Sequence, residues 1–205
     1  MAVEYQWAER RAELIAAAIE VIAERGLEGT RLADVGERAG ISTGHVLYYF
    51  DSKADLFLQA LRRVEDQLRE DAERSFEGLP SAAARWEWLL ENATPVGPGD
   101  VRLLLWLEAW ERAPRDEQVA AVLAELESRW MELVVGVLRH GESTGELEVA
   151  DLEGFAVWFS ALMDGLTIQV VTGNPGIDRQ AMLAICHRIS RSEVRWRTPS
   201  GRRRP

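Results

Sequence analysis

Apolar residues recur at three- and four-residue spacing along almost the whole chain, and no run of strand-like alternation is convincing. The pattern predicts an all-α fold of about nine helices, with three short helices before the longer ones. The first helix has an apolar face that ends before Gly26, a residue type that readily stops a helix. That face is formed by Leu14, Ala17, Ala18, Val21 and Ile22.

Chemically clear breaks divide the remainder of the chain. The loop "TPVGPGD" and two later loops end in Asp100, Asp151 and Asp178, each placed to cap the helix that follows. Pro114 suits the first turn of a helix. The predicted long helices therefore span residues 53–77, 82–92, 101–112, 114–140, 152–172 and 179–192.

Two short predicted helices, 31–39 and 42–50, are joined by a turn at Gly40 and Ile41, which is the arrangement of a helix-turn-helix. Thr30 and Ser42 can cap them. The second helix starts with the small polar sequence "STGH", and free N–H groups at a helix start favour phosphates and base edges. Gly44 would let a phosphate approach the backbone closely. The pattern favours a nucleic-acid-reading helix.

Lys53 is the only lysine beside 23 arginines, and it follows an aromatic cluster. It stands in the first turn of a predicted helix, where the helix dipole disfavours a cation. An external anion is therefore a reasonable partner, although a solvated surface position is the alternative.

Charge limits how the protein can bind nucleic acid. The 205-residue chain has a net charge of −10, and residues 1–63 hold eight basic and ten acidic side chains. Bulk electrostatic coating of DNA is thereby disfavoured, so affinity must come from a few placed contacts. The single cysteine, the N-terminus without a secretory pattern and the absence of an 18-residue apolar run favour a cytoplasmic location away from membranes.

The stretch "GLEGTRLADVGERAGISTGHVLYYFDSKADLF", residues 26–57, resembles the tetracycline-repressor (TetR) family of bacterial transcriptional regulators, and "STGHVLYYF" resembles its choline-responsive branch. The resemblance implies that the helix 43–49 lies in the major groove of DNA. Many members have tyrosine at the position of Leu47, so either Tyr48 or Tyr49 takes that phosphate contact here or the contact is missing. The candidate DNA-binding residues are Thr30, Arg31, Ser42, Thr43, Gly44, His45, Tyr48, Tyr49 and Lys53. Core packing is the alternative for Tyr49, and a plain surface position is the alternative for His45.

The last two predicted helices carry more apolar surface than one core face needs, which is typical of a subunit interface. In the resembling family these helices form a four-helix bundle with their twins. A homodimer on a palindromic double-stranded operator is therefore expected. The candidate interface residues are Phe155, Leu166, Val170, Met182, Ile185, Cys186 and Ile189.

Large aromatic residues in the second half are candidates for a small-molecule site, although plain core packing is the alternative. Residues 64–205 have a net charge of −8, and tryptophan faces attract cations, so a cationic or aromatic inducer is favoured. Asp164 could add a counter-charge, or it could be a buried partner for an arginine. The candidate ligand-binding residues are Leu103, Trp106, Leu107, Trp110, Trp130, Trp158, Phe159, Leu162 and Asp164.

These observations predict a helix-turn-helix domain at 1–52, a ligand-binding and dimerisation domain at 53–192, and a disordered basic tail at 193–205. No cofactor, metal or catalytic residue is expected, because HExxH, CxxC and glycine-rich phosphate motifs do not occur. The expected function is a ligand-released transcriptional repressor. A transcriptional activator and a helical interaction protein without DNA function are the alternatives, and an enzyme is disfavoured.

Overall fold

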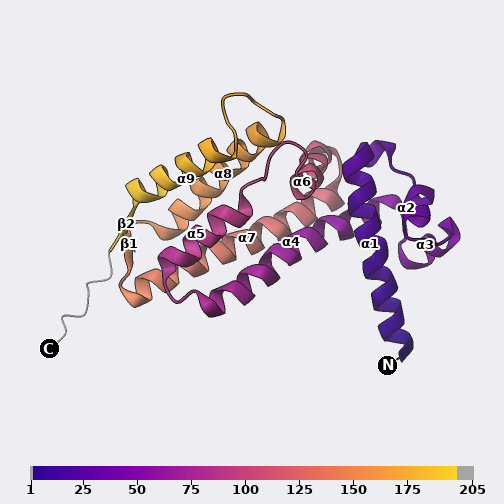
Figure 1. Ribbon diagram of the computed structural model, residues 1–205, viewed down its shortest axis with the longest axis horizontal. Coiled ribbons are helices and arrows are strands. Elements are labelled where there is room, and N and C mark those ends of the chain that lie inside the picture. Colours follow the sequence, from indigo (N-terminus) through magenta and orange to yellow (C-terminus); the bar gives the residue numbers. More distant parts are fainter. Residues whose placement is uncertain (1, 198–205) are drawn as a thin grey trace. The chain divides into compact units, whose positions relative to one another are not determined.

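The computed structural model describes residues 2–197, with nine α-helices and one two-stranded sheet in that part of the chain (Figure 1). The predicted all-α fold and helix count are confirmed. The helices are α1 (Ala2–Gly29), α2 (Leu32–Arg38), α3 (Thr43–Tyr49), α4 (Lys53–Gly78), α5 (Ala82–Ala93), α6 (Val101–Arg112), α7 (Glu117–Thr144), α8 (Leu152–Val171) and α9 (Arg179–Glu193). The antiparallel strands are β1 (Leu147–Val149) and β2 (Val194–Trp196), with Leu147 opposite Trp196.

The contacts divide the chain into two compact units. Unit 1 consists of residues 1–67 and 99–126, and unit 2 consists of residues 68–98 and those from Glu127 onward. This grouping places α6 with the N-terminal helices rather than with the later ones. The functional boundary at residue 52 stays a prediction, since compactness alone does not say which segment carries which activity.

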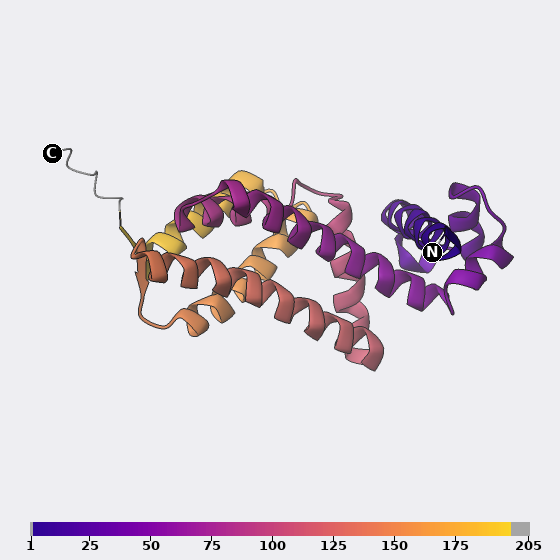
Figure 2. The ribbon, with the colours of Figure 1, turned by 90° about the horizontal axis from the view of Figure 1, so that it is seen from below.

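Unit 1 is built around the apolar face of α1. Leu14, Ala18 and Val21 are fully or almost fully buried, as are Val35 of α2 and Val46 of α3. Figure 2 looks nearly along α1 and shows α2 and α3 on one side of it. The predicted face of α1 is therefore the face that holds the helix-turn-helix.

The turn between α2 and α3 depends on two glycines. Gly40 has a φ of 71°, in the left-handed region that the sequence predicted for it. Gly36 was not foreseen: a Cβ there would lie 2.7 Å from the Ile41 carbonyl oxygen. A side chain at position 36 would push α3 away from α2.

Unit 2 has a core in which α5, α7, α8 and α9 share apolar side chains. Trp86 and Phe159 have ring centroids 5.0 Å apart, and the Phe155 ring stacks at 5.3 Å from that of Phe159. Helices α8 and α9 pack side by side (Figure 1). The helix α8 is long and apolar enough to cross a membrane by length and composition alone, and 39% of its most apolar window is buried.

Three boundaries differ from the predicted ones. Pro114 lies in a 3₁₀ turn, Ala113–Arg115, and α7 begins only at Glu117 because the Asp116 carboxylate accepts the N–H groups of Gln118 and Val119. The helix α7 continues to Thr144. The predicted disordered tail starts too early, because β2 pairs with β1 and the Arg197 N–H donates to the Glu146 carbonyl oxygen at 2.7 Å. The tail beyond residue 197 lies outside the described residues.

Candidate nucleic-acid interface and aromatic residues

The start of α3 is fixed by Ser42. Its hydroxyl accepts the His45 backbone N–H at 3.4 Å and lies 3.0 Å from His45 Nδ1. Ser42 is therefore the predicted N-cap, and its second contact ties the imidazole to the same end of the helix. Such a cap leaves the remaining N–H groups of the first turn pointing toward an incoming ligand.

One face of α3 is exposed to solvent, and it carries no acidic side chain. Tyr48 is 72% exposed, and Leu47 is 51% exposed. A tyrosine hydroxyl can contact phosphate, and an aliphatic side chain can contact the methyl group of thymine. Leu47 is a candidate contact residue that the sequence argument treated only as a missing tyrosine. The other exposed candidates are Arg31, Ser42, Thr43, Gly44 and His45.

Gly44 is not required by the fold. A Cβ at this position would meet only the Ser42 hydroxyl, at 3.9 Å, and the backbone there is helical. An ordinary side chain would fit within the chain itself. The bare backbone at this point is therefore suited to close approach from outside, as the sequence predicted.

The end of α3 turns inward. Tyr49 is partly buried, with its ring 5.7 Å from that of Trp7 on α1. Phe50 is 1% exposed and lies beneath the Arg11 guanidinium, which is 5.1 Å from its ring centroid. Packing against α1 is thus a sufficient role for Tyr49, while Tyr48 remains available to a partner.

Thr30 has a different position from the predicted one. It is 2% exposed, and its hydroxyl donates to the Gly26 carbonyl oxygen at 2.7 Å. The N-cap of α2 is Arg31, whose N–H donates to the Asp34 carboxylate at 2.9 Å. Thr30 therefore closes the end of α1 instead of capping α2, because the interruption at Gly26 leaves a carbonyl group to satisfy.

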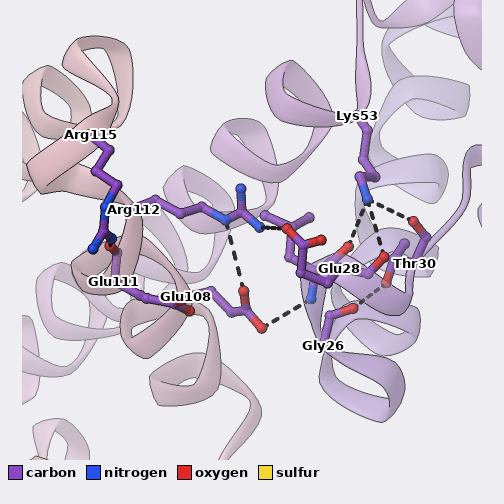
Figure 3. A network of polar contacts seen from close by, with 9 residues as sticks. Gly26, Glu28, Thr30, Lys53, Glu108, Glu111, Arg112 and Arg115 are labelled. Atoms are coloured by element: carbon purple, nitrogen blue, oxygen red, sulfur yellow. Dashed lines mark hydrogen bonds and ion pairs between the residues drawn. The ribbon is translucent and has the colours of Figure 1, made fainter.

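Lys53 has internal partners that the sequence argument missed. Its ammonium group donates to the carbonyl oxygens of Leu27 at 2.9 Å and Thr30 at 3.1 Å (Figure 3). The dipole of the helix that Lys53 begins disfavours a cation in its first turn. The structure brings the ammonium to the C-terminal end of another helix, α1, whose carbonyl groups attract a cation.

Several acidic side chains of unit 1 are paired with arginine on α1 and α2. The Arg38 guanidinium donates to Glu20 at 2.7 Å and Glu24 at 2.8 Å, and Arg25 lies 2.8 Å from Asp34. The hydrogen bond from Arg38 holds the pKa of Glu24 below its usual value. These three acids lie on α1 and α2, and their charge is offset by the arginines that they contact.

Helix α6 holds four of the predicted ligand residues, and the structure separates them. Leu103 and Trp106 are buried, and the rings of Trp106 and Trp110 are 5.4 Å apart. Leu107 instead lines a cavity between α1 and α6. The predicted set therefore does not form one continuous wall.

Glu65 of α4 is an acidic group that the sequence argument did not single out. It accepts a hydrogen bond of 2.6 Å from Trp106 Nε1. Enclosure of its carboxyl group raises the pKa of Glu65, against the opposing effects of Arg102 and of the bond from Trp106. No local motif marks this residue, because its burial depends on the packing of α4 against α6.

The remaining ligand candidates belong to unit 2. Phe159 is 1% exposed, and Trp130 Nε1 donates to the Ser160 hydroxyl at 2.9 Å, so both have roles in internal packing. Leu162 is partly buried against the core, and Trp158 is 38% exposed with its ring 5.1 Å from that of Phe155.

Asp164 is not the buried partner of an arginine. The residue is exposed, and partial desolvation together with the nearby Glu127 carboxylate raises the pKa of Asp164 to about 6. Within the described residues, no group of three or more histidine, cysteine, aspartate or glutamate side chains is arranged to hold a metal ion.

Comparison with known proteins places this geometry in a family. A model of the C-terminal domain of BetI-type transcriptional repressors matches residues 82–194, which is more than half of the chain. The chain belongs to the TetR family of transcriptional regulators, in its BetI-type branch. A model of the bacterial regulatory proteins of the tetR family also matches residues 14–60, the segment that holds α2 and α3.

Similar proteins agree with this TetR-family assignment. The HTH-type transcriptional regulator BetI of Escherichia coli O45:K1 is 24% identical over 194 residues, which cover 93% of this chain and 95% of that protein. A putative transcriptional regulator from Saccharomonospora viridis, solved in complex with choline, is 27% identical with a TM-score of 0.81. That likeness covers 91% of this chain and 98% of the other. A TetR-family regulator from Rhodococcus sp. is also 27% identical, with a TM-score of 0.75 and 89% and 98% of the two chains covered.

Within this TetR-family fold, most of the predicted interface residues are intramolecular core. Phe155, Val170, Met182 and Cys186 are at most 3% exposed, because α8 and α9 pack against other helices of unit 2. Leu166 and Ile189 are only partly buried against the same core, and Ile185 is also partly buried. The surplus apolar surface lies instead on another face of α8, which we call the open face. Its apolar members are Val157, Trp158, Ala161, Gly165 and Ile168, and the exposed Asp164 stands among them.

Proposed function

We propose that the protein is a homodimeric, ligand-responsive repressor that binds a palindromic operator through α3 and is released by a small organic cation. The observation that carries the DNA-binding part is the exposed, acid-free face of α3 beyond the Ser42 cap. Arg31, Thr43, His45 and Tyr48 are the contact residues we assign to it. Gly44 allows the DNA backbone to approach α3 closely, since no contact inside the chain requires a glycine at this position.

The open face of α8 supports the homodimer. Val157 is 61% exposed, and Trp158 and Ile168 are each 38% exposed on the same side of one helix. Ala161 and Gly165 between them are small, and a Cβ at Gly165 would meet no atom within 4 Å. Helices approach closely at small residues, so a second α8 fits this face. A twofold pair of α3 helices then demands a palindrome with half-sites about one DNA turn apart, or a multiple of it.

The inducer class rests on aromatic rings beside a carboxylate. Trp106 and Trp110 form a ring pair on α6, and Trp106 holds the enclosed carboxylate of Glu65. Aromatic faces attract an organic cation, and a bound cation would in turn favour the ionised form of Glu65. The choline in the complex of the Saccharomonospora viridis regulator is a cation of this kind, which adds support by similarity. Trp130 and Trp158 of unit 2 remain secondary candidates.

The proposal assigns no catalytic role to any residue, and it places the protein in the cytoplasm, where a regulator meets the chromosome. Sequence selection from random duplex DNA with the purified protein tests the operator claim, and a selected palindrome is the expected result. Release of that duplex by choline chloride, but not by sodium acetate at equal ionic strength, is expected for a cationic inducer. Recovery of no preferred sequence would contradict the DNA-binding function, and release by acetate alone would contradict the inducer class.

Repressor and activator differ only in where the operator lies relative to a promoter. Transcription in vitro from the promoter beside the selected site distinguishes them. Added protein should lower the transcript, because a dimer on the promoter excludes polymerase. A rise in transcript would assign the activator role.

A further inference from the structure

The peptide units at the end of α1 are held from two other helices (Figure 3). Gly26, with a φ of 68°, interrupts α1 just before its last residues. The Leu27 N–H donates to Glu108 Oε1 of α6 at 3.0 Å, while the Leu27 carbonyl oxygen accepts from the Lys53 ammonium of α4 at 2.9 Å. One residue therefore ties α1 to both α6 and α4 within unit 1.

Gly26 makes room for this contact. A Cβ at Gly26 would lie 3.1 Å from Glu108 Oε1, and its positive φ is a conformation that other residues rarely adopt. The glycine thus supplies both the interruption that frees the Leu27 N–H and the space for the carboxylate that accepts it.

Arg112 reinforces the connection one turn later on α6. Its Nη2 donates to Glu28 at 2.5 Å, and this bond lowers the pKa of Glu28 below its ordinary value. Arg112 Nε lies 3.9 Å from Glu108 Oε2, which is an ion-pair distance but too long for a hydrogen bond. Arg112 Nε is buried and has no hydrogen-bond partner. Two side chains of α6 therefore form hydrogen bonds with consecutive residues of α1.

Helices α1 and α6 pack against each other and leave an open pocket between them. The pocket has a volume of about 250 Å³ and is lined by Ile22, Ala23, Gly26, Leu104, Leu107 and Glu108, among others. The hydrogen bond from the Leu27 N–H to Glu108 lies at this pocket and adds to the packing between the two helices.

We propose that Glu108 and Arg112 are positioning residues for DNA binding, which set the direction of the reading helix from outside the helix-turn-helix segment. This inference rests on the proposed function, in which α3 reads the operator. The residues they hold, Leu27 and Glu28, stand only a few positions before α2, and α2 packs on α3. A ligand that moves α6 through Trp106 or Trp110 therefore acts on α1 through the same two side chains.

The test compares three variants of the full-length protein: Glu108→Ala, Glu108→Gln and Glu111→Ala. Glutamine keeps an oxygen that can accept the Leu27 N–H. Glu111 lines the same pocket from the same helix, and its backbone carbonyl oxygen accepts a hydrogen bond from Arg115 that an alanine would keep, so it is a matched control. The readouts are affinity for the selected operator, hydrogen exchange of the Leu27 amide by NMR, and the midpoint of thermal unfolding.

Glu108→Ala should bind the operator about tenfold more weakly and should expose the Leu27 amide to exchange about tenfold faster, as expected for one lost hydrogen bond to a charged group. Glu108→Gln should stay within about threefold of wild type in both. Glu111→Ala should match wild type.

Unchanged operator affinity and exchange in Glu108→Ala would overturn the inference. The inference would also be overturned if all three variants lost operator affinity in proportion to a lower unfolding midpoint. That result would show a loss of general stability rather than of one contact. If the wild type selects no DNA sequence, the proposed function fails instead. The exchange rate of the Leu27 amide then decides by itself whether Glu108 holds the end of α1, and an unaltered rate in Glu108→Ala rejects that contact.

Discussion

Helices α3 and α8 both expose side chains that are suited to a binding partner. The two sets of side chains differ in their chemistry. The seven-residue α3 exposes hydroxyl, imidazole and tyrosine groups around a bare glycine. The twenty-residue α8 exposes valine, tryptophan and isoleucine around alanine and glycine. The first surface suits a charged, hydrogen-bonding partner, and the second suits an apolar copy of itself.

The difference teaches that exposure has to be judged against the chemistry of each surface. Sequence periodicity identified α8 as too apolar, but it selected the side chains that face the core of unit 2. At α3 the polar residues were correctly expected to face solvent. The helix has seven residues and buries only Val46, so its polar side chains stay exposed.

The largest effect is expected from a charge on the open face of α8. Val157→Glu should give a folded monomer, because it adds a second carboxylate beside Asp164 at a contact between two copies of the helix. Operator affinity should fall by about 100-fold or more, since two half-site contacts no longer act together. Sedimentation and operator titration measure both. Val96→Glu is the control, because Val96 is also exposed, at 78%, but lies in the loop after α5. A dimer that survives Val157→Glu rejects the open face as the interface.

The reading function of α3 is tested at His45. His45→Ala should relax the preference at one base pair in each half-site and cost about 1–3 kcal/mol on the selected operator. The folded structure should persist, because the residue is exposed. Titrations against the operator and its single-base variants measure the change. Equal losses on random DNA would make His45 a backbone contact.

Lys53 and Arg31 should respond in opposite ways. Lys53→Ala removes the donor to three carbonyl groups, so the free energy of unfolding should fall by about 1–2 kcal/mol while the salt dependence of DNA binding stays the same. Arg31→Ala should reduce the salt slope by about one unit with little loss of stability, because its side chain is exposed. Urea unfolding and binding at several salt concentrations give both quantities. A lower salt slope for Lys53→Ala would instead show that Lys53 contacts a phosphate in the wild-type complex.

The smallest effect is expected at Asp164. Its pKa is raised from 3.8 to about 6, so the folded state favours the protonated carboxyl group. The resulting stability is present below pH 3.8 and is lost as the pH rises through about 6. Asp164→Asn should therefore be more stable than wild type at pH 7 by about 1 kcal/mol, a value discounted for solvent screening, and equal to it near pH 4. Thermal unfolding at the two pH values measures this, and a gain that persists at pH 4 contradicts it.

Local chemistry determined much of this protein in advance. Glycines and capping side chains placed the helix limits, because Gly40 needs a left-handed turn and Ser42, Asp100, Asp151 and Asp178 accept N–H groups of the helix that each precedes. The exposed face of α3 followed from the same kind of evidence.

Only the tertiary structure decided which partner each long side chain meets. Lys53 reaches the end of α1, 26 residues earlier, and Glu108 reaches Leu27 across 81 residues. Helical spacing shows which side of a helix is apolar. It does not say whether that side packs against another helix of the same chain or against a second molecule. Caps and turns act over a few bonds, whereas burial and ion pairing depend on packing between segments that the sequence keeps far apart.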